Sequence, residues 1–155
     1  MRLRVVDFGH VPALRSQAVY HGLATAMGAD DDPVLSLVNP NDPYVCVGIH
    51  QEIAREVDVD YCAAMRLPII RRQVGGGAVY LDRNQMFFHF IYPRGKAPQY
   101  AANLYPLFCE PAVRTYRELG VQAEYRPIND IQVAGRKIGG TGAASIGEAT
   151  VRLPT

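Results

Sequence analysis

Short apolar runs rich in β-branched residues, separated by turn-forming residues and a few helix-like stretches, limit the fold of this chain more than any other feature. The runs end in glycine, proline, asparagine or aspartate, which is typical of strands joined by turns. No repeat, low-complexity tract or obvious linker interrupts them, and the 155 residues are 48% hydrophobic and 20% charged, which suits one domain with a real core. The sequence therefore predicts a single domain over residues 1–155 that mixes α and β structure.

Three segments carry helical patterns. Residues 16–27 place apolar side chains at helical spacing. Residues 58–67 favour a short helix stopped by a proline, and residues 100–119 favour a long helix with one apolar face, whose two prolines can shift its start or kink it. The residues expected to cap these helices are Ser16 at the first N-terminus and Gly28 and Gly120 at two C-termini.

Strand-like runs fill most of the remaining chain. The runs at 34–39 and 44–49 are expected to pair with each other across a tight connection. The runs at 78–81 and 86–92 are expected to form a second pair at the centre of the sheet, because they are the most apolar part of the chain. Further strands are expected at 69–72, which delivers two arginines to its end, and at 121–126, 130–135, 137–145 and 148–153.

The charge pattern gives no reason to expect nucleic acid or a membrane as a partner. A formal net charge of +1 produces no long-range field, so an anion site must be made locally. No window approaches the roughly 20 apolar residues that span a bilayer, and the N-terminus lacks the apolar stretch of a signal peptide. We therefore expect a cytoplasmic protein whose chemistry comes from a pocket.

The cysteines and histidines suggest neither a disulfide framework nor a metal centre. Cys46, Cys62 and Cys109 are an odd number without a C-x-x-C pair, and each lies in an apolar neighbourhood typical of the core. The histidines lack metal-ligand spacing, and His89 in MFFHFIY is expected in the core or the sheet.

The first chemical signal is RRQVGGGAVY at residues 71–80, where three glycines follow two arginines at a strand end. Glycine lets backbone N–H groups approach a ligand closely, and arginine adds a fork of donors with fixed charge, which suits a phosphate or a carboxylate. Neither G-x-G-x-x-G nor the P-loop pattern is present, which excludes the common nucleotide fingerprints. Alone, the glycine run fits a tight turn equally well.

The second signal is NDIQVAGRKIGGTG at residues 129–142. Asp130 at a strand start can hold Mg²⁺ or receive a ligand hydroxyl, and Lys137 near a glycine-flanked turn is a mobile charge for phosphate oxygens or a carboxylate. The plain alternative is a β-hairpin whose turn carries two solvated cations. The presence of the first signal favours one ligand held by both segments.

RRQVGGGAVYLD and NDIQVAGRKIGG resemble the two signatures of the lipoate-protein ligase family. They occur in the family's order, and weaker matches extend from the 16–27 helix through VCVGIHQ to Gly147. The resemblance implies the α+β fold shared with biotin ligases: a mixed, mainly antiparallel sheet packed by helices, with the acyl-adenylate in a cleft under the glycine loop. It also implies ATP-dependent activation of lipoate to lipoyl-AMP and its transfer to a lysine of a lipoyl-acceptor protein, with ATP and Mg²⁺ as co-substrate.

Roles are carried over by motif position. The resemblance implies that Arg71 and the backbone of residues 75–77 embrace the acyl-phosphate end, and that Lys137 is the catalytic residue that contacts the carboxylate and α-phosphate. It implies that Asn129 and Asp130 hold the nucleotide, with Asp130 as the ligand of Mg²⁺. The implied acyl-adenylate-binding residues are Arg71, Arg72, Gly75, Gly76, Gly77, Ala78, Val79, Asn129, Asp130, Lys137 and Gly140.

The physical chemistry of adenylation agrees with these roles. Attack of a carboxylate on ATP brings two anions together, so cations must offset their repulsion and the charge of the transition state. An apolar channel must also receive the lipoyl chain. Val74, Val79 and Phe88 are candidates to line it, and core packing is the alternative for each.

The sequence departs from the family pattern in three places. Leu81 stands where the first signature has histidine, so that histidine's hydrogen bond is absent. GGTG at residues 139–142 replaces serine-glycine-x-alanine, which adds flexibility and keeps the turn. Family members continue past the GEAT strand, so we expect the C-terminal part of the family domain to be missing or supplied by a second chain, and the unfinished sheet to favour an oligomer or poor solubility.

Three other functions stay open. An octanoyl or lipoyl transferase acts from acyl carrier protein without ATP through a cysteine thioester, but its nucleophile follows the motif lysine, and no cysteine follows Lys137 here. Biotin ligation fits less well, because its signature differs from RRQVGGG. A non-catalytic subunit of a split ligase, or a lipoate-binding protein, is favoured by Leu81 and the short C-terminus. The sequence does not decide between lipoate and octanoate.

Overall fold

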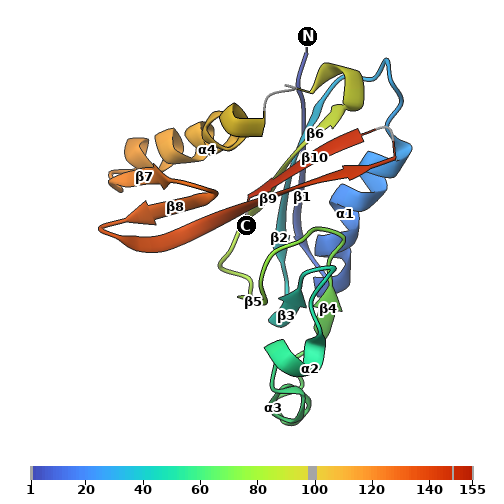
Figure 1. Cartoon of the computed structure of the whole chain (residues 1–155), viewed down its shortest axis with the longest axis vertical. Coiled ribbons are helices and arrows are strands. Elements are labelled where there is room, and N and C mark those ends of the chain that lie inside the picture. Colours follow the sequence, from blue (N-terminus) through green and yellow to red (C-terminus); the bar gives the residue numbers. More distant parts are fainter. Residues whose placement is uncertain (1, 98–100, 148, 155) are drawn as a thin grey trace.

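The computed structural model of the chain describes residues 2–97, 101–147 and 149–154. Within these ranges the strands form a seven-stranded sheet in the order β1-β2-β6-β10-β9-β8-β7 and a three-stranded sheet in the order β4-β3-β5 (Figure 1). In chain order the elements are β1 (Arg4–Val11), α1 (Ala13–Ala26), β2 (Val34–Pro40), β3 (Tyr44–Val47), α2 (Ile53–Glu56), α3 (Val59–Ala64), β4 (Ile69–Arg71), β5 (Val79–Leu81), β6 (Phe87–Pro93), the 3-10 helix η1 (Arg94–Lys96), α4 (Ala101–Glu118), β7 (Ala123–Arg126), β8 (Asp130–Val133), β9 (Arg136–Ile146) and β10 (Ala149–Pro154).

The larger sheet is mainly antiparallel; β1 and β2 are its one parallel pair in the part of the chain that the structure describes. This confirms the predicted α+β class and the β-rich end of the chain. β6, an apolar run expected at the centre of the sheet, lies between β2 and β10. The long β9 pairs with β10 along one half and with β8 along the other, so it carries the sheet out to one side (Figure 1).

The expected pairing of neighbouring strands is wrong in both places. β2 pairs with β1 and β6, whereas β3, the next strand, pairs with β4 and β5 in the smaller sheet. β5 likewise joins the smaller sheet, and β6 the larger one. Pro40 ends β2 and Pro43 precedes β3, and neither can donate a ladder hydrogen bond. The connection therefore carries the chain between sheets instead of closing a hairpin.

α1 covers one face of the larger sheet. It packs against β2, β6, β9 and β10, and its Tyr20 and Ala24 share an apolar cluster with Ile91 and Val151. Burial of this cluster supplies the main driving force for holding helix and sheet together, at roughly 25 cal/mol per Å² of apolar surface.

The ends of α1 differ from those expected. The helix begins one turn early, at Ala13 after Pro12, and Ser16 is a buried residue inside it rather than its cap. The Ser16 hydroxyl donates to the carbonyl oxygen of Ala13 at 2.7 Å. At the other end Met27 is extended and ends the helix, so Gly28 is not its cap.

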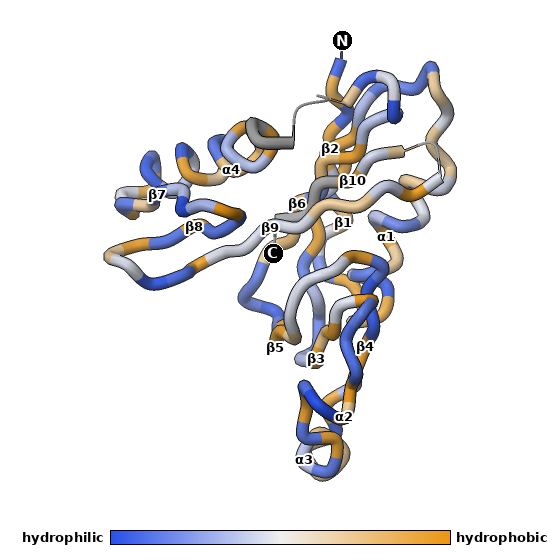
Figure 2. Tube along the Cα trace, viewed as in Figure 1, coloured by the Kyte–Doolittle hydropathy of each residue, from blue (hydrophilic) through white to orange (hydrophobic). Residues whose placement is uncertain are grey.

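α4 covers the far end of the larger sheet, where Cys109 and Val113 pack against Ala123 and Ile131 of β7 and β8. Hydrophobic and hydrophilic residues alternate along this helix (Figure 2), as expected when one face is buried. Two prolines lie inside the helix, and Gly120, with φ of +83°, follows its end as predicted. Two residues of the predicted elements, Tyr100 and Glu148, lie outside the described residues.

Two short helices lie beyond the smaller sheet. α3 is the helix expected at residues 58–67, and the Asp58 carboxylate caps it by accepting from the Tyr61 N–H at 2.9 Å. α2 is a single turn without apolar periodicity and was not predicted. Within the described ranges, none of the helices has the length and apolar character needed to cross a membrane.

Tyr44 links α1 to the smaller sheet. Its side chain is fully buried, and its hydroxyl lies 2.8 Å from Ser16 Oγ and accepts from Gln17 Nε2 at 2.7 Å. Burial raises the pKa of Tyr44 to about 12, so the hydroxyl keeps its proton at neutral pH. The contact fixes the smaller sheet, which carries the glycine loop, relative to α1.

We predict that replacing Tyr44 by phenylalanine lowers the free energy of unfolding by about 1–3 kcal/mol, because the Gln17 amide then stays buried without its partner. Urea denaturation measures the change. Tyr80→Phe is the matched control, since Tyr80 is 53% exposed, and it should change stability by less than about 0.5 kcal/mol. Equal stability of the two variants would contradict the role of Tyr44.

Candidate active site

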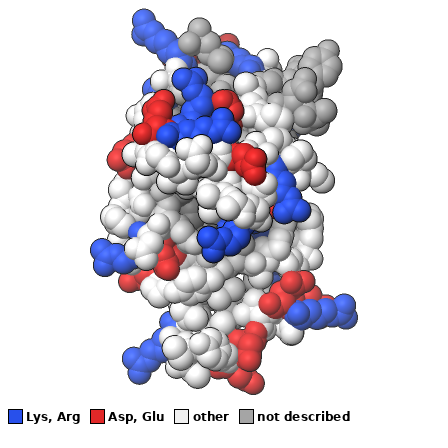
Figure 3. Space-filling model, turned by 90° about the vertical axis from the view of Figure 1, so that its left-hand side faces the viewer, with Lys and Arg blue, Asp and Glu red and all other residues white. Residues whose placement is uncertain are grey.

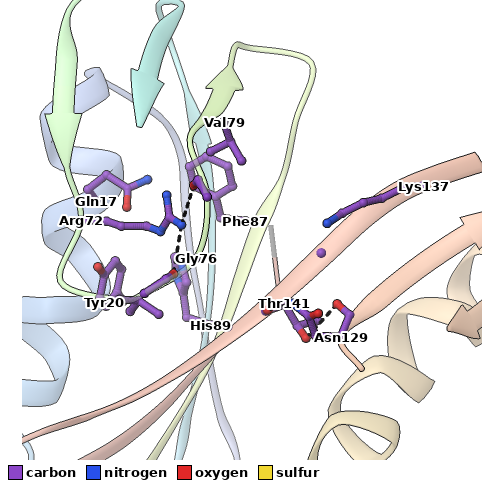
Figure 4. A pocket seen from close by; sticks show the side chains of 15 residues that line it. Gln17, Tyr20, Arg72, Gly76, Val79, Phe87, His89, Asn129, Lys137 and Thr141 are labelled. Carbon is purple, nitrogen blue, oxygen red and sulfur yellow. Dashed lines mark hydrogen bonds between the residues drawn. The ribbon is translucent and has the colours of Figure 1, made fainter. Parts of the chain in front are cut away.

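A pocket of about 100 Å³ lies between α1, the glycine loop at residues 72–77, β6 and the start of β9 (Figure 4). It brings together both sequence motifs, which are far apart along the chain. The predicted binding residues that line it are Arg72, Gly75, Gly76, Gly77, Val79, Asn129, Lys137 and Gly140. Arg71, Ala78 and Asp130 are not among the lining residues, and Ala78 instead lines a second pocket beside α3.

Arg72 holds the glycine loop in its folded shape. Its Nη2 donates to the carbonyl oxygens of Gly75 at 3.0 Å and Gly77 at 2.9 Å, while Nη1 donates to the Cys46 carbonyl oxygen at 3.2 Å. Between the two loop carbonyls, Gly76 has φ of +104°, a conformation that favours glycine. The arginine thus fastens the loop to β3.

Arg71 supports the neighbouring loop instead of the pocket. Its Nη1 donates to the carbonyl oxygens of Gly48 at 2.9 Å, Ile49 at 3.1 Å and Gln51 at 2.7 Å. Successive strand residues point to opposite faces, so the two arginines diverge at the end of β4. The family resemblance gave Arg71 the contact with the acyl-phosphate end, whereas in this structure Arg72 lines the pocket and Arg71 does not.

The glycine loop passes directly over Gly48. A Cβ added at Gly48 would lie 2.1 Å from the Gly76 carbonyl oxygen, so no side chain fits there. The Ile49 N–H donates to the Val74 carbonyl oxygen at 3.2 Å and holds the crossing in place. This contact was not predicted from the sequence, where VCVGIHQ was one of the weaker family matches.

Lys137 and Asp130 meet at the mouth of the pocket. The Lys137 ammonium lies 2.7 Å from Asp130 Oδ1, and their side chains are 57% and 25% exposed. A β-bulge creates this meeting: Gly139 pairs with Ile131 and Lys137 pairs with Gln132, which leaves Ile138 as an extra residue. Regular pairing would place Lys137 opposite Val133, on the face of the sheet away from Asp130.

Asn129 and Thr141 fasten the loop before β8 to β9. Asn129 Nδ2 donates to the Thr141 carbonyl oxygen at 2.6 Å, and Thr141 Oγ1 donates to the Asn129 carbonyl oxygen at 3.1 Å. The Asn129 side-chain oxygen has no recorded partner among the described residues, so it can accept a hydrogen bond from a ligand.

The inner end of the pocket comes from residues that the sequence did not assign to a site. Tyr20 and Gln17 reach it from α1, and Phe87 and His89 from β6. The Tyr20 hydroxyl accepts from the Gln73 N–H at 3.2 Å, and its ring centroid lies 5.2 Å from that of His89. These contacts join segments that are distant in the sequence. Sequence analysis therefore identified the local glycine-rich motifs and did not identify these residues.

His89 is a buried neutral histidine. Its Nδ1 lies 2.8 Å from Ser36 Oγ, and burial lowers its pKa to about 3. The prediction that His89 is a core or sheet residue is confirmed, and the same side chain also lines the pocket. Among the channel candidates, Val74 and Val79 line the pocket, whereas Phe88 packs in a cluster with Phe90.

Cysteines do not contribute to this pocket. Cys46, Cys62 and Cys109 are free and buried, which confirms their predicted place in the core. Burial raises the pKa of the Cys46 and Cys109 thiols, which disfavours the nucleophilic thiolate. Leu81, at the position where the first signature has histidine, is buried against Tyr44 and its neighbours.

Charge around the site is local. Basic and acidic side chains are interspersed on the face shown in Figure 3, in agreement with the formal net charge of +1. The described residues include no group of three or more histidine, cysteine or acidic side chains that could hold a metal ion. Asp130 alone suits a Mg²⁺ ion that arrives with phosphates, since such ions keep few protein ligands.

Residues 12–152 match the family described as the lipoyl protein ligase A/B catalytic domain. Lipoate-protein ligase LplJ of Bacillus subtilis is 36% identical over 100 residues, which cover 64% of this chain and 29% of that protein. A putative lipoate-protein ligase A of Aeropyrum pernix is 30% identical over 143 residues, which cover 92% of this chain and 49% of that protein. The chain thus spans half or less of the length of these relatives.

Solved structures agree in fold. A bi-partite lipoate protein ligase of Thermoplasma acidophilum superposes with a TM-score of 0.86 at 24% identity, covering 99% of this chain and 60% of that chain. A lipoate-protein ligase A bound with ATP superposes with a TM-score of 0.84 at 23% identity, covering 99% and 66%. These similarities confirm the predicted ligase-like α+β fold.

We predict that Gly48→Ala destabilises the chain by several kcal/mol or displaces the glycine loop, because the new methyl group would overlap the Gly76 carbonyl oxygen. Gly22→Ala is the matched control: Gly22 lies within α1 with open space around its Cα, so alanine should raise helix stability by up to about 1 kcal/mol. Urea denaturation of both variants tests the contrast, and equal effects would contradict the tight crossing.

We further predict that His89 makes the fold sensitive to acid. Its pKa is depressed to about 3, against 6.5 when unfolded, so its contribution to stability is present above pH 6.5 and is lost as pH falls toward 3. Between pH 7 and 4.5 the wild type should lose about 2–3 kcal/mol more than Ser36→Ala/His89→Leu, which has no proton to bind there. Parallel losses in denaturation experiments at the two pH values would refute this.

Proposed function

The chain belongs to the lipoyl protein ligase A/B catalytic domain family, and we propose that it activates lipoate with ATP to lipoyl-AMP and passes the lipoyl group to a lysine of an acceptor protein. One observation carries the proposal: a single pocket holds the glycine loop, the motif lysine Lys137 and an inner end lined by Tyr20, Val74 and Phe87. ATP bound to a similar fold supports the choice of nucleotide.

In the first step, a lipoate carboxylate oxygen attacks the α-phosphorus of ATP, and pyrophosphate leaves. Two anions approach each other, so the step needs positive charge that strengthens its contacts as the transition state forms. Lys137 is the mobile cation for this role, and glycine-loop N–H groups and Arg72 add fixed donors around it. Arg71 could reach the phosphates only by leaving the three carbonyls it now holds.

Asn129 and Asp130 would hold the nucleotide. The free side-chain oxygen of Asn129 can accept from a ribose or base donor, and the Asp130 carboxylate can share a Mg²⁺ ion with the phosphates. Mg²⁺ would neutralise phosphate charge when bound. Lys137 must then turn from Asp130 toward the α-phosphate, a small movement for a side chain that is 57% exposed.

The acyl chain would enter the inner end, past Val74 and Val79. A pocket of about 100 Å³ is smaller than the roughly 300 Å³ of typical ligand sites, so the glycine loop must move outward to admit the substrate. Enclosure of the mixed anhydride would then protect it from water until the acceptor lysine amine attacks its carbonyl and AMP leaves.

The transferase alternative receives less support. It needs a cysteine beside the acyl carbonyl, and no cysteine lines the pocket in the described part of the chain. Cys109 is fully buried on the side of α4 that packs against β7 and β8. An octanoyltransferase of Exiguobacterium shares 37% identity over 84 residues, so the family membership alone does not separate the two chemistries.

A split ligase is the second candidate function. Lipoate-protein ligase A subunit 1 of Thermoplasma acidophilum is 30% identical over 107 residues. This chain would then supply the binding pocket, and a second chain would complete the enzyme and help to receive the acceptor domain. In that case lipoate and ATP bind to the chain alone, and turnover requires the second chain.

We predict that Lys137→Ala lowers formation of lipoyl-AMP at least about 100-fold while the chain stays folded, since the mobile charge is removed from an exposed site. Mass spectrometry of the nucleotide products after incubation with MgATP and lipoate measures this. Arg136→Ala is the matched control, because Arg136 is the cation next to Lys137 in the chain and does not line the pocket. Full activity of Lys137→Ala would sink the assigned role, and wild type that binds lipoate and ATP without forming lipoyl-AMP would favour the split ligase.

A further inference from the structure

We propose that His89 is a specificity-determining residue, whose Nε2–H group donates a hydrogen bond to a sulfur of the lipoyl ring and so favours a sulfur-bearing acyl chain over a plain alkyl chain. This inference rests on the proposed function, because it assumes that the acyl chain occupies the inner end of the pocket. It names a residue that would distinguish lipoate from octanoate, a choice that the two sequence motifs leave undecided.

The position of His89 fits the distal part of an acyl chain. Lys137 and Asn129 lie on one side of the pocket, and Tyr20 and His89 on the other (Figure 4). The carboxylate and phosphate must lie near the cation, so the tail extends toward Tyr20 and His89. Successive residues of a strand point to opposite faces of the sheet. Phe87 and His89 therefore face the pocket, while Phe88 faces α4.

The hydrogen bond to Ser36 fixes which ring nitrogen carries the proton. Ser36 is fully buried, and its hydroxyl oxygen lies 2.8 Å from His89 Nδ1. Among the described residues, this hydroxyl has no acceptor other than His89 Nδ1. If Ser36 accepted from Nδ1–H, its own O–H would be buried without an acceptor, which would destabilise the fold. The serine hydroxyl therefore donates to Nδ1, and the single proton of the neutral ring sits on Nε2.

The Nε2–H group is open to the pocket. Among the described residues, Ser36 is the one hydrogen-bond partner of the His89 ring. Every fully enclosed side-chain nitrogen or oxygen of the described residues has a hydrogen-bond partner. Nε2 must therefore keep access to the pocket that His89 lines. A ligand that fills the inner end either accepts from this N–H group or leaves it buried and unpaired.

Lipoate and octanoate differ in this respect. A dithiolane sulfur is a weak acceptor, and a methylene group accepts nothing. Sulfur also contacts aromatic rings favourably, and the rings of Tyr20 and Phe87 lie 5.2 and 6.3 Å from the imidazole between centroids. A neutral hydrogen bond contributes about 0.5–1.5 kcal/mol, and a preference of about 3- to 10-fold lies within that range.

The test measures dissociation constants by titration calorimetry for lipoate, for octanoate, and for an octanoate analogue with one methylene near its end replaced by sulfur. The variant is Ser36→Ala/His89→Leu, which removes both partners of the buried pair and leaves no orphaned group. Phe88→Leu is the control, because it changes the same strand on the face away from the pocket.

We expect the wild type and Phe88→Leu to bind lipoate about 3- to 10-fold more tightly than octanoate, with the sulfur analogue between them. The double variant should lose this preference and bind octanoate at least as well as the wild type. An unchanged ratio in the double variant, with both acids bound, overturns the role of His89 and leaves the ligase proposal standing. Failure of the wild type to bind either acid overturns both.

A measurement without substitution covers the case in which the double variant does not fold. Nitrogen NMR of the histidine ring in the wild type reports which nitrogen of His89 is protonated. We expect the Nε2–H form in the free chain, and a change at Nε2 on addition of the sulfur analogue that exceeds the change with octanoate. The Nδ1–H form, or equal responses to the two ligands, would overturn the inference.

Discussion

The pocket depends on two arginines that are bonded to the protein's own backbone. Arg72 binds the carbonyl groups of the glycine loop, and Arg71 binds those of the loop beneath it. Charge-assisted hydrogen bonds of this kind are roughly twice as strong as neutral ones, and they allow two loops to cross where Gly48 leaves no room for a side chain. Because these cations are already engaged, Lys137, the other cation among the described lining residues, is the one left to move with a substrate.

The β-bulge at Ile138 gives that lysine its place. A regular ladder would turn Lys137 to the opposite face of the sheet, and the extra residue brings it beside Asp130 instead. The ion pair is partly exposed, so it contributes little to stability and can separate at low cost. The arrangement combines a fixed backbone with a cation whose present partner is readily exchanged for a phosphate.

Sequence alone predicted the fold class, most strands and both motifs, because hydrophobic period and glycine pattern are local properties. It failed on strand pairing, since the choice between two sheets depends on contacts such as that of Tyr44 with Gln17. It also gave Arg71 the contact with the acyl-phosphate end, whereas Arg72 lines the pocket, because the directions of the two side chains follow from the end of β4. The sequence could not identify Tyr20 and His89 as pocket residues, because the two side chains come together only when α1 packs on β6.

A buried histidine in an acyl channel is a compromise between affinity and selection. A charged donor would have to lose its hydration when an apolar chain covered it, at a cost of several kcal/mol, whereas a neutral N–H loses much less. The burial that lowers the pKa of His89 is therefore the condition under which it can face such a chain. Ser36 adds the second condition, because its hydroxyl keeps the proton on the nitrogen that faces the pocket. Apolar neighbours can then supply affinity, and one neutral donor can supply the preference.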